Sequence, residues 1–300
     1  MNKLVDKKQL SDDVFRMTFE APYIAEARKA GQFIIIQLDD NFGERIPLTI
    51  ADADEEAGTI TIIFQAVGKT TLTLSALEVG DHIANVLGPL GTPTHIEKWG
   101  TVVCVGGGIG VAPMHPIVQA VKKAGNKVIT IMGARNKELL ILEEEMKEWS
   151  DEVIVCTDDG SYGRKDLVTV PLKELCEAGV PDIVFAIGPP IMMKFAAETT
   201  RPFGVKTMVS LNTIMVDGTG MCGGCRVTVG EDTKFVCVDG PEFDGHLVDF
   251  DNMMSRQKAY KKQETGAKEQ CNIGLDRGGQ SSGPEAAGAG NQAPAKEPAT

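Results

Sequence analysis

The segment TVVCVGGGIGVAP (residues 101–113) passes from apolar, β-branched residues into glycines and then into residues that suit a helix start. Glycines let the backbone turn tightly and approach a pyrophosphate, whose charge is favoured by the free N–H groups at a helix N-terminus. In the form GxGxxP the turn uses Gly108, Gly110 and Pro113. Proline suits a first helical turn, whereas the usual dinucleotide fingerprint has glycine there. We therefore expect a nucleotide-binding turn of a different lineage.

Strand-like and helix-like runs alternate downstream of this turn. Three further apolar runs are separated by amphipathic stretches and lie at residues 127–135, 152–160 and 182–190. This pattern is typical of right-handed βαβ units in a parallel sheet. The last run ends in GPPIMM, a second tight turn that contains Gly188, Pro189 and Met192. Ligands of open α/β sheets bind at the carboxyl edge, where both turns fall, so we expect NAD(H) between them.

Charged groups at two strand ends bear on the choice between NAD and NADP. Asp158 and Asp159 end the run at 152–160, where a carboxylate accepts hydrogen bonds from ribose hydroxyls and repels a 2'-phosphate. Arg135, which ends the run at 127–135, argues for the opposite choice unless it is only a solvated surface cation. On balance the pattern favours NAD, with Asp158 as the ribose ligand.

The part of the chain before Trp99 consists of short segments with period-two alternation and closely spaced turns. Such a pattern predicts a small antiparallel barrel or sandwich. Within it, Arg45 of RIPLTI offers a bidentate charged fork for a phosphate. The segment VGKTT offers backbone and hydroxyl donors near a predicted short helix, from Gly68, Lys69, Thr70 and Thr71. Together the two segments indicate a diphosphate site, although each alone is equally consistent with an ordinary loop.

Three of the seven cysteines crowd into a glycine-rich stretch, where a role in the core is implausible. Cys222 and Cys225 have CxxC spacing, and Cys237 follows after eleven intervening residues. A plant-type iron–sulfur pattern, Cx4CxxC, would have its first cysteine at the position of Asp217. We therefore infer a 2Fe–2S cluster with Asp217 as the fourth ligand. A zinc site remains the alternative, because CxxC with two further ligands is also a zinc pattern.

Length and composition limit the possible functions. The chain has 300 residues and a net charge of −12, without the clustered Lys and Arg that nucleic acid and anionic lipid require. No run approaches the roughly 20 apolar residues of a membrane span. We expect a cytoplasmic protein that binds neither nucleic acid nor membranes. The predicted domains are an antiparallel β barrel at 1–99, a parallel-sheet α/β domain at 100–205, a cluster module at 206–262 and a disordered tail at 263–300.

The order of motifs, RIPLTI, VGKTT, GPLG, GGGIGVAP and GPPIMM, is similar to that of the ferredoxin reductase superfamily. The resemblance implies that FAD binds in the barrel and NAD(P) in the second domain. In that superfamily the Arg of an RxxS/T-like motif holds the FAD diphosphate and the Ser or Thr hydroxyl approaches flavin N5. The match implies these roles for Arg45 and for Thr49, the one catalytic candidate. It also implies aliphatic packing on the flavin by Pro47 and Leu48, where an aromatic residue often stands.

The whole arrangement resembles two families: the small (alpha) subunits of NADH-dependent ferredoxin:NADP oxidoreductase, also called sulfide dehydrogenase subunits, and the electron-transfer subunits of dihydroorotate dehydrogenase. The segments VSLNTIMVDGTGMCGGCRVTV and CVDGPEFDGHLVDF carry the resemblance most specifically. The dihydroorotate relatives normally have Cys at the place of Asp217, so the aspartate favours the first, bifurcating family. That family implies a heterodimer with a larger flavin and 4Fe–4S subunit, and ferredoxin as an indirect partner. An electron donor to dihydroorotate dehydrogenase and a zinc-stabilised nucleotide-binding module without turnover remain alternatives.

Overall fold

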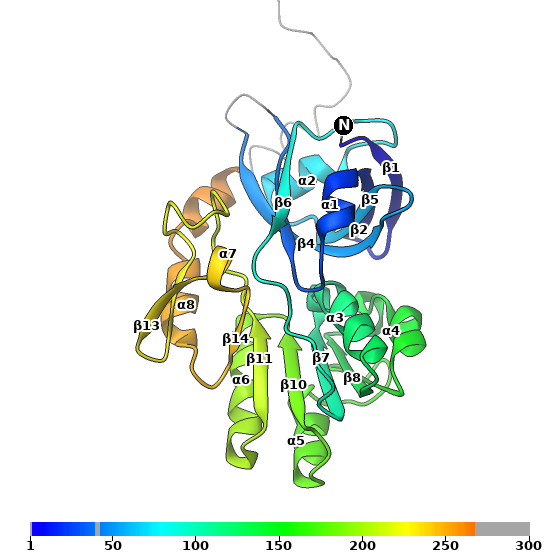
Figure 1. Ribbon diagram of the computed structural model, residues 1–300, viewed down its shortest axis with the longest axis vertical. Helices are drawn as coiled ribbons and strands as arrows, with labels where there is room; N and C mark the ends of the chain where they lie inside the picture. Colours follow the sequence, from blue (N-terminus) through cyan, green and yellow to red (C-terminus); the bar gives the residue numbers. More distant parts are fainter. Residues whose placement is uncertain (1, 40–42, 268–300) are drawn as a thin grey trace, which may run out of the picture.

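The computed structural model describes residues 2–39 and 43–267 (Figure 1). Its N-terminal part is a six-stranded antiparallel sheet, the first sheet, in the order β1-β2-β5-β4-β3-β6. The strands are β1 (Leu4–Gln9), β2 (Val14–Glu20), β3 (Phe33–Gln37), β4 (Arg45–Asp54), β5 (Thr59–Gln65) and β6 (Asn85–Leu90), with helices α1 (Pro22–Ala27) and α2 (Lys69–Ser75). Strand β5 illustrates the alternation, because Ile60, Ile62 and Phe64 are buried between half-buried residues. The predicted antiparallel architecture is confirmed.

The second sheet has the order β14-β11-β10-β7-β8-β9, and the neighbours from β11 to β9 pair in parallel. Its parallel strands are β7 (Thr101–Gly107), β8 (Lys127–Ala134), β9 (Glu152–Thr157), β10 (Ile183–Ile187) and β11 (Lys206–Ser210). The covering helices are α3 (Val111–Lys123), α4 (Glu143–Trp149), α5 (Thr169–Glu177) and α6 (Pro190–Thr200). Helices α3 and α4 pack on one face, and α5 and α6 on the other. The prediction of a parallel α/β domain is confirmed.

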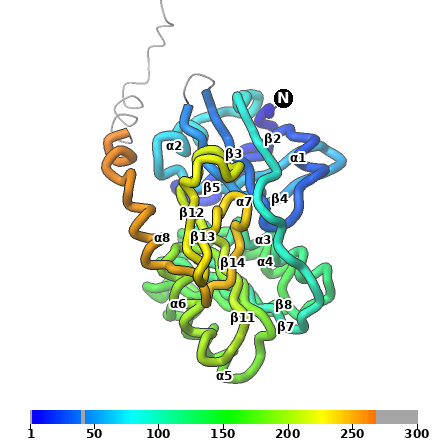
Figure 2. Tube along the Cα trace, turned by 60° about the vertical axis from the view of Figure 1, so that its left-hand side comes forward, coloured from blue at the N-terminus to red at the C-terminus, as the bar shows by residue number. Residues whose placement is uncertain are grey.

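The C-terminal segment forms a hairpin, a short helix, a strand and a longer helix beside both sheets (Figure 2). These elements are β12 (Arg226–Val229), β13 (Asp232–Phe235), α7 (Val236–Asp239), β14 (Glu242–Asp244) and α8 (Phe250–Gln257). Strand β14 pairs with β11 in antiparallel orientation. The second sheet therefore continues past the predicted division at 205/206, because β11 belongs to it and the module contributes a further edge strand.

The expected disordered tail needs one correction. Residues 261–267 are helical, so the first five residues of the predicted tail, 263–267, have regular structure. The rest of that segment lies outside the described residues.

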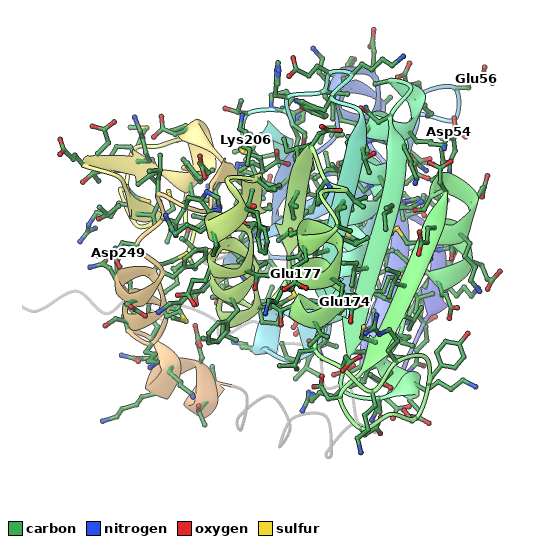
Figure 3. All side chains as sticks on the ribbon, turned by 90° about the horizontal axis from the view of Figure 1, so that it is seen from below. Asp54, Glu56, Glu174, Glu177, Lys206 and Asp249 are labelled. Carbon is green, nitrogen blue, oxygen red and sulfur yellow. The ribbon has the colours of Figure 1, made fainter. Side chains whose placement is uncertain are left out.

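Charged side chains cover the outside of both sheets. Figure 3 labels six of them, all exposed and all but one acidic: Asp54, Glu56, Glu174, Glu177, Lys206 and Asp249. Within the described ranges, no helix is long and apolar enough to cross a membrane.

The segment between the two sheets is fastened to the C-terminal module. The Thr94 hydroxyl, which is buried, donates to Glu242 Oε1 at 2.5 Å, and the Thr92 amide donates to the Gly240 carbonyl at 2.6 Å. Withdrawal of the Glu242 carboxyl from water raises its pKa to about 7. The carboxyl at the junction of the three parts therefore favours its neutral form more than an exposed glutamate does.

We expect the stability of the wild-type chain to fall relative to Glu242→Gln as the pH rises from about 4.5 to about 7. The folded chain holds the Glu242 proton in this window while the unfolded chain has released it, so stability decreases with pH. The relative loss should reach on the order of 2 kcal/mol above pH 7. Urea unfolding between pH 5 and 8 measures it, with the exposed Glu231→Gln as control. Parallel stability curves for wild type and Glu242→Gln would contradict the assignment.

Candidate functional site

The two glycine turns of the second sheet meet at its carboxyl edge. A Cβ atom on Gly110 would lie 2.3 Å from the Ile187 carbonyl oxygen, and one on Gly107 would lie 2.3 Å from Met192 Sδ. The turn after β7 therefore packs directly on GPPIMM, which has Gly188 before α6 and Pro189 as its N-cap. Gly108 has a φ of +54°, and no atom lies within 4 Å of the place where its Cβ would be, so the turn is open on that side. The structure brings these predicted residues together.

Asp158 and Arg135 follow neighbouring strands of the same edge. Both are exposed, and the Asp158 amide donates to the Ala134 carbonyl at 3.1 Å. Strand β8 lies between β7 and β9, so Asp158 is two strands away from the glycine turn. An extended dinucleotide would have to span that separation. Pro113, in contrast, lies in the first turn of α3, directly beyond the glycines.

Strand β4 carries the candidate flavin residues on alternate faces. Arg45, Pro47 and Thr49 pair with residues of β3 on one face, whereas Leu48 packs into the core of the first sheet. Successive side chains of a strand point to opposite faces. Arg45, Pro47 and Thr49 therefore share one face of the strand, and Leu48 lies on the other.

Arg45 has a donor that fits an anionic group. Its Nε is buried and has no hydrogen-bond partner among the described residues. A guanidinium is always charged, and an unpaired buried donor is costly, so a phosphate there would complete its hydrogen bonding. The neighbouring Glu44 accepts a hydrogen bond from the Thr70 hydroxyl, which brings the start of α2 beside the start of β4.

The start of α2 supplies the remaining candidates. Gly68 is its N-cap, and the Gly68 amide donates to the Thr71 hydroxyl oxygen at 3.0 Å. Lys69 is the first residue of the helix. The sequence prediction of one diphosphate site from two distant segments therefore agrees with their placement, and the residues present fit such a group.

Two of the three clustered cysteines are buried together. Cys225 Sγ lies 3.2 Å from Cys237 Sγ, and Cys222 is exposed. Burial raises the pKa of the Cys237 thiol. Metal binding requires thiolates, so loading of this site must release protons.

Asp217 faces the same group of cysteines. Its carboxylate accepts hydrogen bonds from the Thr219 amide at 2.8 Å and from the Cys222 amide at 2.7 Å. The Thr219 amide is the main reason why the pKa of Asp217 is lowered. An ionised carboxylate therefore lies next to a candidate ligand thiol. Among the described residues, no three His, Cys, Asp or Glu side chains are already gathered in metal-binding geometry. The donor set, three thiols and one carboxylate, nevertheless fits an iron–sulfur cluster in its chemistry.

The loop that carries this set, residues 217–225, is here called the cysteine loop, and it lies against the first sheet. A Cβ atom on Gly218 would lie 2.7 Å from a side-chain carbon of Ile35 and 2.9 Å from one of Leu90. Arg45 Nη2 donates to the Asp217 carbonyl at 3.4 Å. Because Ile35 pairs with Pro47, the loop lies on the strand face that carries Arg45, Pro47 and Thr49. The candidate flavin and cluster residues are thus adjacent.

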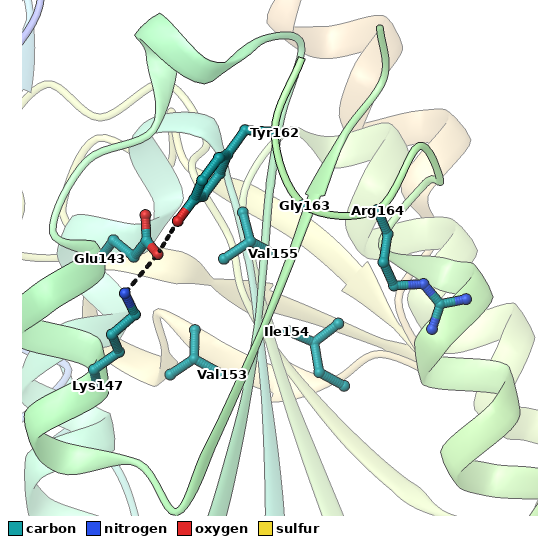
Figure 4. A pocket seen from close by; sticks show the side chains of 8 residues that line it. All are labelled: Glu143, Lys147, Val153, Ile154, Val155, Tyr162, Gly163 and Arg164. Atoms are coloured by element: carbon teal, nitrogen blue, oxygen red, sulfur yellow. Dashed lines mark hydrogen bonds and ion pairs between the residues drawn. The ribbon is translucent and has the colours of Figure 1, made fainter. Parts of the chain in front are cut away.

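A cavity of about 490 Å³ lies elsewhere, at the outer edge of β9 (Figure 4). Three of its polar side chains satisfy one another, because the Tyr162 hydroxyl donates to Glu143 and Lys147 lies 2.8 Å from Glu143. None of its lining residues is a candidate cofactor ligand.

Sequence reasoning did not single out the residues that join the parts, which are Thr94, Glu242 and Ile35. The Thr94–Glu242 hydrogen bond and the approach of Gly218 to Ile35 both span large separations in the chain. Glu242 and Gly218 lie within the segments that carry the family resemblance, but that resemblance gave neither residue a role. The φ of +74° and the close neighbours of Gly218 explain why this position has no side chain.

The fold and the site define a ferredoxin reductase-type oxidoreductase with an added iron–sulfur domain. Three family models match the chain: "oxidoreductase FAD-binding domain" at residues 1–95, "oxidoreductase NAD-binding domain" at 104–198, and "iron-sulfur cluster binding domain of dihydroorotate dehydrogenase B" at 212–249. The third match favours iron over zinc. The predicted FAD-, NAD- and iron–sulfur-binding parts are confirmed.

Relatives match the chain over most of its length. It is 52% identical to an uncharacterized protein of Clostridium beijerinckii, over 88% of this chain and 92% of that one. It is 49% identical to a Thermotoga maritima homologue of the dihydroorotate dehydrogenase B (NAD(+)) electron transfer subunit, over 88% and 93% of the two chains. A solved structure of the NADH-dependent reduced ferredoxin-NADP oxidoreductase is 47% identical, with a TM-score of 0.85 and coverage of 90% and 97%. The chain belongs to the family of dihydroorotate dehydrogenase B electron-transfer subunits and their homologues.

We expect Gly110→Ala to destabilise the chain by about 2 kcal/mol and to weaken NAD(H) binding, because its methyl group would collide with the backbone of the GPPIMM turn. Urea unfolding and NADH titration measure the two effects. Gly125→Ala is the matched control, since Gly125 has a φ of +83° but open space. It should lose about 1 kcal/mol through backbone strain and bind NADH normally. Wild-type stability in Gly110→Ala would refute the packing of the two turns.

Proposed function

We propose that this chain exchanges a hydride between NAD(H) and FAD and relays single electrons through a 2Fe–2S cluster to a larger subunit. In this proposal the partner carries a second flavin and 4Fe–4S clusters, and the heterodimer is an electron-bifurcating NADH-dependent ferredoxin:NADP oxidoreductase that meets ferredoxin indirectly. The observation that carries the proposal is the contact of Arg45 with Asp217, which joins the two candidate cofactor sites. The similarity to the solved oxidoreductase structure supports the choice of partner.

In the flavin site, the Arg45 guanidinium and the amides and hydroxyls from Gly68 to Thr71 bind the FAD diphosphate. The unpaired Arg45 Nε supports this role. Thr49, two residues beyond Pro47 on the same strand face, presents its hydroxyl to the flavin ring and orients it. Pro47 and Leu48 are proposed to give aliphatic packing on the flavin, and Leu48 also packs against the core of the first sheet.

In the nicotinamide site, Gly108 and Gly110 let the backbone approach the pyrophosphate, while Asp158 accepts from the adenosine ribose and disfavours a 2'-phosphate. Gly188, Pro189 and Met192 form the opposite wall, in line with their contact with the first turn. Hydride transfer between stacked rings depends on positioning more than on acid–base groups. When bound, the flavin supplies the change from two-electron to one-electron chemistry.

In the cluster site, Asp217, Cys222, Cys225 and Cys237 ligate the 2Fe–2S cluster. Three thiols and an ionised carboxylate on glycine-rich backbone support this set. A compartment that keeps thiols reduced suits such a site, and we place the protein in the cytoplasm on that ground. The proposed division has a flavin domain at 1–99, a nicotinamide domain from 100 and a cluster module up to 262, but β11 (Lys206–Ser210) belongs to the second sheet and residues 263–267 are helical.

A second candidate function is electron donation to dihydroorotate dehydrogenase. It is favoured by the iron–sulfur family match and by relatives such as the electron transfer subunit of Caldanaerobacter subterraneus, which is 34% identical over 80% of this chain. Copurification with one partner or the other distinguishes the two functions. Recovery of a dihydroorotate-oxidising complex would replace the first proposal.

We expect Arg45→Gln to weaken FAD binding by about tenfold or more, because a charge-assisted hydrogen bond contributes roughly 1.5–3 kcal/mol. Equilibrium dialysis of FAD against the flavin-free protein measures the affinity. Arg16→Gln removes a partly exposed Arg from the same sheet, one that pairs with Asp6, and should bind FAD as wild type does. Equal affinity in the wild type and Arg45→Gln would remove Arg45 from the flavin site.

We expect Asp217→Ala to lose most of its iron while it retains FAD, because the fourth ligand is gone and the first sheet is unchanged. Iron, sulfide and flavin analysis of anaerobically purified protein measures the outcome. Asp232→Ala, in the exposed hairpin of the same module, should keep its full iron content. If Asp217→Ala keeps as much iron as Asp232→Ala, Asp217 is not a ligand.

A further inference from the structure

Three guanidinium groups donate to backbone carbonyls of the cysteine loop. Arg45 Nη2 donates to the Asp217 carbonyl at 3.4 Å, as described above. Arg226 Nη1 donates to the Gly223 carbonyl at 3.1 Å, and Arg256 Nη2 donates to the Gly224 carbonyl at 3.3 Å. The acceptors lie at the start of the loop and between its two cysteines. Arginine remains charged at every accessible pH, so each contact places a fixed positive charge beside the loop.

The three arginines come from different parts of the fold. Arg45 begins β4 in the first sheet, Arg226 begins β12, and Arg256 lies in the last turn of α8. Arg226 is exposed, whereas Arg256 is partly buried. Helix α8 packs against β12, which brings Arg256 to the loop. No short segment of sequence would produce this convergence.

One peptide group links an arginine to a ligand thiol. The Gly223–Gly224 peptide accepts from Arg226 at its carbonyl and donates from its amide to Cys222 Sγ at 3.4 Å. Its positive end therefore faces a candidate ligand atom, and the guanidinium group polarises it further. The Cys222 amide separately donates to the Asp217 carboxylate, while Arg45 and Arg256 hold the carbonyls of Asp217 and Gly224.

We propose that Arg226 and Arg256, together with Arg45, are positioning residues that hold the cysteine loop by its carbonyls and favour the reduced state of the cluster. This inference rests on the proposed 2Fe–2S function. When one electron passes from the reduced flavin to the cluster, no bond forms or breaks, and the cluster gains one negative charge. The chain has a net charge of −12, which opposes that gain. Fixed positive charges and hydrogen bonding around the ligands offset it, since both help to set cluster potentials.

The test uses the complete chain with flavin and cluster, poised anaerobically at the wild-type midpoint potential, with the cluster signal read by electron paramagnetic resonance. In Arg256→Gln the reduced-to-oxidised ratio should fall about three- to tenfold, where tenfold corresponds to about 59 mV for one electron. Arg226→Gln should lower the ratio less, because its contact is exposed and water screens its charge. Arg256→Lys, which keeps the charge, should stay within about twofold of wild type.

Arg201→Gln is the matched control, because Arg201 also donates to a carbonyl, that of His246, at 2.8 Å outside the cysteine loop. It should leave the ratio unchanged. Arg256→Gln could instead lose iron while Arg256→Lys keeps it, with unchanged circular dichroism in both variants. That result would also support the proposal that the Arg256 side chain holds the cysteine loop in place. A wild-type ratio and full iron content in both Arg256→Gln and Arg226→Gln would overturn the inference. If the wild-type chain itself shows no cluster signal, the proposed function fails, and the inference about the arginines fails with it.

Discussion

The contact between the cysteine loop and the first sheet is the constraint on which the rest of the structure depends. Gly218 approaches Ile35 and Leu90 so closely that any side chain there would displace the loop. Beside it, Arg45 holds the Asp217 carbonyl. The strand face that carries the candidate flavin residues is therefore also the support of the candidate cluster ligands. Electron transfer between two redox centres requires that they lie close together, and this contact provides the closeness without a flexible tether.

The second sheet holds the candidate nicotinamide residues under a similar packing constraint. Its two glycine turns pack tightly on each other, and Gly108 lies on the side that is left open. Strand β14 joins the C-terminal module to the same sheet, and the Thr94–Glu242 hydrogen bond fastens the connecting segment to that module. The module is thereby linked to the second sheet, to the connecting segment and, through the cysteine loop, to the first sheet.

Local patterns in the sequence were sufficient to predict the two sheets, but not to predict how the sheets and the C-terminal module pack together. The alternation in TITIIFQ and the strand–glycine–helix order after Thr101 predicted both sheets, because side-chain periodicity and backbone freedom are local properties. The short strands β11 and β14, of five and three residues, escaped prediction because their pairing is decided by tertiary contacts. The Arg45–Asp217 contact, across 172 positions, has no local signal at all.

The most direct test of the account is to reduce the anaerobic wild-type protein with excess NADH and to follow flavin bleaching and the cluster's electron paramagnetic resonance signal in the same samples. The account predicts that the signal of the reduced cluster appears together with the loss of flavin absorbance, because the two sites share one support. A bleached flavin beside a cluster that stays oxidised, but that dithionite reduces at once, would contradict it.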